Sequence, residues 1–157
     1  VNSGFNLRPT DIAAAIGIVQ LKKMNTMNAN RIKNYENLQL ALTNHSQWKG
    51  QLDFVEPTPG TKPVWFGFCA LLSQKFANGK IGYLSELSKC GIENRPIVSG
   101  NFVRQPALKL YGLEQNPENF PGAEEIHKRG FFIGLHTTPL SEEKILRLAR
   151  RDKGRLM

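Results

Sequence analysis

Polar and charged residues that could bind an anion gather in two segments of this 157-residue chain. The first is Asn6-Leu7-Arg8-Pro9, directly before Thr10, where a helix is expected to begin. The free N–H groups and the dipole at a helix start favour an anion nearby. The residues alone leave this segment undecided between an anion site and a plain capped loop.

The second segment runs from Arg95 to Pro106 and follows a predicted strand. It holds two guanidinium groups, on Arg95 and Arg104, together with the amide of Asn101 and the permissive Gly100. Guanidinium groups suit paired hydrogen bonds to phosphate, and connections after strands often carry ligand sites. We therefore favour a binding loop here, with a solvated surface turn as the alternative.

Motifs for self-contained catalysis are missing from the sequence. His45, His127 and His136 sit in different contexts, none beside a known nucleophile motif, and there is no HExxH, P-loop or GxGxxG. Cys69 and Cys90 lie far apart and form no CxxC, which favours buried free thiols over a disulfide or zinc. A self-contained hydrolase and a metal site are not expected.

The charge balance suits an anionic partner. Lysine and arginine number 21 against 13 aspartates and glutamates, a net charge of +8. The basic carboxyl end lacks interleaved aromatics, so it is interpreted as a solvated helix end and no nucleic acid partner is predicted. No apolar run reaches the roughly 20 residues that span a bilayer, and no signal segment is visible. The sequence thus predicts a cytoplasmic protein without a membrane partner.

The elements that would position these segments begin with a helical arm over residues 1–44. Thr10 can cap a helix to about Met24, with apolar residues at helical spacing, and Gly17 within it suggests a closely packed neighbour. The polar residues 25–30 weaken or kink the pattern before a second apolar stripe ends at Asn44. The arm is therefore either one long helix or a broken one.

Residues 45–157 predict a small α+β domain. Strands are expected at 52–55, 64–72, 92–98 and 131–135, and helices at 79–90, 106–112, 122–129 and from about 142 to 151. The apolar run at 64–72 should be buried, which places Trp65, Phe66 and Phe68 in the core rather than on a base-stacking platform. A small, mostly antiparallel sheet covered by helices is the expected fold.

Several of these residues match a known signature. Gly4 to Asp11, followed by Ala14-Ala15-Ile16-Gly17 and Gln20-Leu21-Lys22-Lys23, resembles the DegT/DnrJ/StrS family of sugar aminotransferases and dehydratases. Ile92 to Phe102, Arg104-Gln105-Pro106 and the segment from Ala123 to His136 resemble its branch of 4-keto-6-deoxy sugar nucleotide 3-dehydratases. The resemblance implies the carboxyl-terminal portion of an aspartate-aminotransferase-like, fold type I enzyme. The arm would then lead to a large amino-terminal domain.

The resemblance also implies a cofactor, partners and site residues. Family members use pyridoxal 5'-phosphate or pyridoxamine 5'-phosphate and form homodimers, in which the residue matching Asn6 reaches the cofactor phosphate of the partner subunit. The implied contacts to the sugar nucleotide or the amino donor are Arg8, Arg95, Asn101, Arg104 and His136. The catalytic base, a histidine in dehydratases and a lysine in aminotransferases, is expected upstream of Val1. The chain by itself is therefore expected to be inactive.

The leading hypothesis is thus that the chain is part of a 3-dehydratase in deoxysugar or lipopolysaccharide biosynthesis. An aminotransferase of the same family is the first alternative. A basic, non-catalytic binding module is the second.

Overall fold

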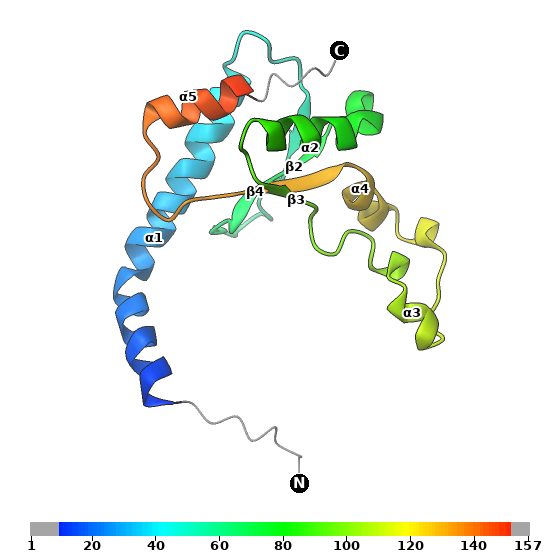
Figure 1. The fold of residues 1–157 in the computed structure, drawn as a ribbon, viewed down its shortest axis with the longest axis horizontal. Helices are drawn as coiled ribbons and strands as arrows, with labels where there is room; N and C mark the ends of the chain where they lie inside the picture. Colours follow the sequence, from blue (N-terminus) through cyan, green and yellow to red (C-terminus); the bar gives the residue numbers. More distant parts are fainter. Residues whose placement is uncertain (1–9, 152–157) are drawn as a thin grey trace.

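The computed structural model describes residues 10–151, and its longest element is the helix α1, Asp11–Thr43, which has 33 residues (Figure 1). Thr10 caps it, since its Oγ1 accepts a hydrogen bond from the Ala13 N–H at 3.3 Å. The helix runs through residues 25–30 without a break, so the long-helix alternative is correct. Asparagines weaken helices when their side chains bond locally, whereas Asn30 donates its amide to the distant carbonyl of Thr137 at 2.9 Å.

Four antiparallel strands form one sheet in the order β1-β2-β4-β3. Their bounds are Leu52–Phe54 for β1, Gly67–Leu72 for β2, Asn94–Arg95 for β3 and Gly130–Gly134 for β4. The antiparallel sheet with helices confirms the predicted α+β fold. Three strands are shorter than expected: β1 ends at Phe54 rather than 55, β2 begins at Gly67 rather than 64, and β3 spans only Asn94–Arg95 rather than 92–98. Strand β3 stops before Pro96, which has no N–H for the ladder.

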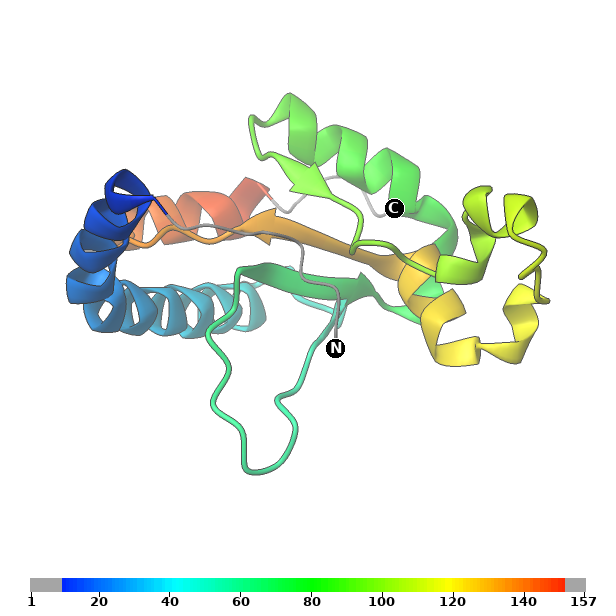
Figure 2. The same cartoon turned by 90° about the horizontal axis from the view of Figure 1, so that it is seen from below.

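Four shorter helices complete the fold. They are α2 (Lys80–Lys89), α3 (Ala107–Leu110), α4 (Pro121–Arg129) and α5 (Glu142–Arg151). Short 3-10 turns lie at Gln74–Gly79, Phe102–Arg104 and Pro117–Asn119. Both views place α3 far from α1, at the opposite end of the molecule, and Figure 2 shows the connection between β1 and β2 projecting from the sheet. None of the helices within residues 10–151 has both the length and the apolar character needed to cross a membrane.

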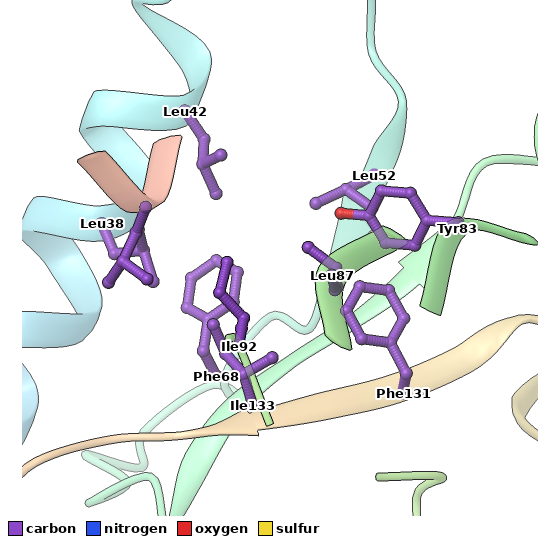
Figure 3. A pocket seen from close by; sticks show the side chains of 10 residues that line it. Leu38, Leu42, Leu52, Phe68, Tyr83, Leu87, Ile92, Phe131 and Ile133 are labelled. Carbon is purple, nitrogen blue, oxygen red and sulfur yellow. The ribbon is translucent and has the colours of Figure 1, made fainter. Parts of the chain in front are cut away.

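The core lies on one face of the sheet. The second half of α1 contributes Tyr35, Leu38 and Leu42, and the sheet contributes Phe68 and Phe131 among others. Helices α2 and α5 close this layer with Tyr83, Leu87, Ile145 and Ala149. Figure 3 shows side chains from α1, α2 and the strands around a small apolar cavity of about 20 Å³ in the layer. Its walls are almost entirely apolar, with the Tyr83 hydroxyl as the exception.

The first half of α1 is different, because its apolar side chains are exposed. They are Ile12, Ile16, Ile18, Val19, Leu21 and Met24. Apart from the adjoining residues and the backbone of its own helix turns, no described heavy atom lies within 4 Å of the place that a Cβ on Gly17 would take. The closely packed neighbour suggested by Gly17 is therefore not among residues 10–151.

Candidate functional site

The structure shows four of the predicted site residues beside the core domain's sheet, Arg95, Asn101, Arg104 and His136, in two places. Asn6 and Arg8 lie outside the described residues. Arg95 ends β3, and Asn101 and Arg104 lie in the connection that follows it. His136 lies just beyond the end of β4. We take the connection from Pro96 to Pro106, called the 96–106 loop below, together with β3 as the candidate binding region.

Arg95 lies on the face of the sheet away from the core. It pairs in register with Phe132 of β4, and directly opposed residues in a sheet share one face. Since Phe131 points into the core, Phe132 and Arg95 point the other way. The Arg95 guanidinium donates to Glu93 Oε1 from Nε at 3.1 Å and from Nη2 at 2.7 Å, and its side chain remains 66% exposed. It can reach a ligand from solvent.

Asn101 and Arg104 meet on a buried carboxylate that sequence reasoning missed. Glu124, in the first turn of α4, accepts hydrogen bonds from Asn101 Nδ2 at 2.9 Å and from Arg104 Nε at 2.9 Å and Nη2. Lys128, one turn further along α4, lies 3.3 Å from the same carboxylate. Only 8% of the Glu124 side chain is exposed. The segment Pro121 to Glu125 gave no signal for this burial, since an acidic residue early in a helix is usually solvated.

The two predicted contacts differ in what they can offer a ligand. Asn101 is 1% exposed, and its Nδ2 also donates to the Pro117 carbonyl at 3.1 Å. Its amide therefore joins the 96–106 loop to α4 and to the turn at Pro117. Arg104 keeps 42% of its side chain exposed despite its contact with Glu124.

Gly100 fixes the same loop by its close approach to α4. Its φ is +66°, a left-handed conformation that glycine adopts readily. A Cβ at this position would lie 2.6 Å from Nδ1 of His127. The imidazole of His127 thus occupies the space that a larger residue would fill.

The charge of Glu124 is strongly stabilised. Hydrogen bonds from Arg104 and Asn101 lower the pKa of Glu124 from its ordinary value of 4.5 to about 2, against the opposing effect of burial. In return, the bond to Glu124 raises the pKa of Arg104. Both groups carry full charge at neutral pH.

The backbone around His136 is attached to α1. Asn34, which is buried, donates its Nδ2 to the carbonyls of His136 at 3.0 Å and Thr138 at 2.8 Å, and its Oδ1 accepts from the N–H of Leu140. The His136 side chain itself is exposed. It is brought near the end of the sheet, and its imidazole is accessible to solvent.

The exposure of one aromatic side chain, Phe66, was also not predicted from the sequence. Phe66 is 72% exposed, so its predicted burial is wrong, whereas Phe68 is fully buried and Trp65 packs against the core. The Phe66 ring lies 5.5 Å from the Arg31 guanidinium and 6.1 Å from the Phe132 ring. The cause is the strand start at Gly67: Phe66 lies before the paired segment, so the ladder does not hold it on the core face with Phe68.

No catalytic centre is visible among residues 10–151. That part of the chain holds no group of three acidic, histidine or cysteine side chains placed to bind a metal. Cys69 and Cys90 form no disulfide but are half-buried rather than buried as predicted, and burial raises the pKa of the Cys69 thiol. What the region offers is the exposed cationic side chains of Arg95 and Arg104, which can bind an anion.

Comparison with known proteins identifies the fold to which this loop belongs. The profile of the DegT/DnrJ/EryC1/StrS aminotransferase family matches residues 1–150. The chain belongs to this family. The match confirms the resemblance in the Asn6 and Arg95 segments, and it extends from the first residue into α5.

Two relatives of the DegT/DnrJ/EryC1/StrS family are similar in sequence. The chain is 34% identical over 141 residues to GDP-4-keto-6-deoxy-D-mannose 3-dehydratase of Yersinia pseudotuberculosis. The aligned segment covers 89% of this chain and 34% of that enzyme. It is 30% identical to a lipopolysaccharide biosynthesis protein of Salmonella typhimurium, over 85% of this chain and 30% of that protein. The chain thus spans about a third of the length of these relatives.

Solved structures of similar proteins superpose on this chain. GDP-4-keto-6-deoxy-D-mannose-3-dehydratase of E. coli, solved with bound hydrated PLP, superposes with a TM-score of 0.80 at 32% identity, covering 96% of this chain and 37% of that one. A putative sugar aminotransferase of Streptococcus pneumoniae in its PMP form has a TM-score of 0.76 at 19% identity, over 92% of this chain and 34% of that one. The second likeness shows the fold alone.

Proposed function

We propose that this chain is the carboxyl-terminal part of a pyridoxal-phosphate- or pyridoxamine-phosphate-dependent 3-dehydratase. Its substrate would be a nucleotide-linked 4-keto-6-deoxyhexose, in deoxysugar or lipopolysaccharide biosynthesis. One observation carries the proposal: among the solved structures, identity is 32% to a 3-dehydratase but 19% to the sugar aminotransferase of comparable fold. An aminotransferase of the same family is the first alternative.

The chain's own residues would bind and orient the substrate. Arg95, Arg104 and His136 have exposed side chains that can contact an anionic or polar ligand. Asn101 would act by shaping the 96–106 loop. Arg8 is a further proposed contact on the basis of its motif. Two cations within one loop region would favour a diphosphate group.

The cavity in the core cannot hold the cofactor. It measures about 20 Å³ and its walls are almost entirely apolar, so it is too small for a pyridoxal ring and holds no cationic partner for a phosphate. When bound, the aminated cofactor would activate the C4 ketone of the sugar. Our proposal places the ring in a larger amino-terminal domain, with residues 1–44 as the arm leading to it and 45–157 as the small domain. Asn6 would contact the cofactor phosphate of the partner subunit in a homodimer.

The test is the product formed by the full-length protein with pyridoxamine phosphate and GDP-4-keto-6-deoxymannose. We expect loss of the hydroxyl at C3, observed by proton NMR and mass spectrometry. An amino group at C4, formed with glutamate and without loss at C3, would instead establish the aminotransferase.

A matched assay uses the 157-residue chain alone, for which we expect no turnover, because the base is expected elsewhere. Detectable turnover by this polypeptide would refute that expectation. Salt-dependent binding of nucleic acid by the full-length protein, with no response to the sugar nucleotide, would favour the basic binding module.

A further inference from the structure

Glu124 is the most heavily bonded carboxylate of the candidate region. Its two oxygens accept from Asn101 Nδ2, Arg104 Nε and Arg104 Nη2, and Lys128 Nζ lies 3.3 Å away. A buried carboxylate needs such partners, since an unpaired one would be costly. Substrate is not required to explain its charge, because the protein already neutralises it.

The contact with Glu124 restricts the guanidinium of Arg104. Nε and Nη2 lie on one edge of the planar fork, and both donate to Glu124. A fork held along one edge cannot rotate, so its remaining N–H groups have a fixed direction. The Arg104 side chain as a whole stays 42% exposed, so a ligand can approach it from solvent. The two cations Arg104 and Lys128 share one carboxylate, so the cluster keeps a net positive charge.

The loop that carries Arg104 is held at two further points. Gly100 lies against the imidazole of His127 on α4, and Asn101 joins Glu124 to the Pro117 carbonyl. Within the loop, the Arg104 N–H donates to the Asn101 carbonyl at 3.0 Å. The start of the turn and the arginine at its end are thus fixed to the same helix.

We infer that Glu124 is a positioning residue, which orients the exposed edge of Arg104 toward a phosphate of the sugar nucleotide. This inference rests on the proposed function for the identity of the ligand. Glu124 itself does not touch the ligand. It acts by fixing the direction of a guanidinium that would otherwise sample several rotamers.

The experiment is a double-mutant cycle on the full-length protein, with GDP and dTDP as probes and affinity measured by calorimetry. Arg104→Ala should weaken binding of the better nucleotide about tenfold, the loss of one charge-assisted contact. Glu124→Gln keeps the shape but turns an N–H₂ group toward Arg104, and should weaken binding about fivefold. In the Arg104→Ala background the same change should alter affinity by less than about twofold. An equal loss in both backgrounds would show a merely structural role and overturn the inference.

Two controls keep the outcome interpretable. Glu118→Gln removes an exposed carboxylate from the neighbouring 3-10 turn and should leave affinity unchanged. If Glu124→Gln does not fold, Arg104→Lys tests the same point, because lysine keeps the charge but loses the fork. Wild-type affinity in Arg104→Lys would contradict the inference.

The proposed function and the positioning role can fail separately. Absence of binding of either nucleotide to the wild-type protein would count against the proposed function. Hydrogen exchange of the backbone N–H groups of Arg104 and Gln105, which are bonded within the loop, reports the anchoring without any ligand. We expect faster exchange in Glu124→Gln than in Glu118→Gln. Equal protection would overturn the role of Glu124 in holding the loop.

Discussion

At the scale of single residues, Glu124 couples folding to pH. The pKa of Glu124 lies near 2 in the folded protein because Arg104 and Asn101 donate to it, against an ordinary value of 4.5. A carboxylate whose pKa falls on folding stabilises the folded state above its unfolded pKa, and this contribution disappears as protons bind. The stabilisation is therefore fully present above about pH 5 and is lost as the pH falls toward 2.

This titration gives a direct prediction. The denaturant concentration at the unfolding midpoint of the wild-type protein should decrease as the pH is lowered from 5 to 2.5. In Glu124→Gln this decrease should be smaller. Glu118→Gln, which removes an exposed carboxylate, should keep the wild-type slope. An unchanged slope in Glu124→Gln would mean that Glu124 is not charged in the folded state as described.

At the scale of elements, α1 is attached to the segment between β4 and α5 by two asparagines. Asn34 makes three hydrogen bonds to the backbone of His136, Thr138 and Leu140, and Asn30 makes one to Thr137. A chain segment without regular structure has backbone groups to satisfy, and these side chains satisfy them. The long helix and the core strand are thereby fixed relative to each other.

Asn34→Ala should therefore destabilise the protein by about 2–3 kcal/mol, since three partly buried hydrogen bonds made by a buried side chain are lost. The measurement is urea unfolding. If the dependence of the unfolding free energy on urea concentration is the same in both proteins, the shift of the midpoint reports the change in stability. Asn25→Ala, at an exposed position of the same helix, corrects for the higher helix propensity of alanine and should be neutral or slightly stabilising. Equal stability of the two variants would contradict the role of Asn34.

At the scale of the whole molecule, the first half of α1 carries two opposed apolar stripes. Ile12, Ile16 and Val19 follow helical spacing on one side, and Ile18, Leu21 and Met24 do so on the other. All six are exposed in the structure. A helix that is apolar on opposite sides is normally covered on both. The chain spans 34% of the length of its Yersinia relative, so our proposal of a larger parent enzyme supplies a covering surface.

The 157-residue chain alone should consequently self-associate through this helix. Sedimentation should show association that increases with concentration, and Ile16→Gln with Leu21→Gln should reduce it. Leu110→Gln, which removes an exposed leucine from α3, serves as the matched control. Association unaffected by the α1 changes would locate the contact elsewhere.

The sequence by itself determined the elements whose signals are local. Gly91 marks the end of α2 with a φ of +76°, and the acidic residues Glu142 and Glu143 open α5. Capping and periodicity act within one or two turns, so they are readable without the fold. The family signature likewise depended on the order of residues along the chain.

Tertiary structure decided the features that depend on distant partners. Phe66 is exposed because pairing of β2 with β4 begins one residue later, and β3 ends where Pro96 interrupts the ladder. The site residue Glu124 lies 20 positions from Arg104, and only the packing of α4 against the 96–106 loop brings them together. Burial and hydrogen-bond partners come from contacts between segments far apart in the chain. Local propensity carries no information about those contacts. The role of Glu124 in holding the 96–106 loop could therefore be recognised only from the tertiary structure.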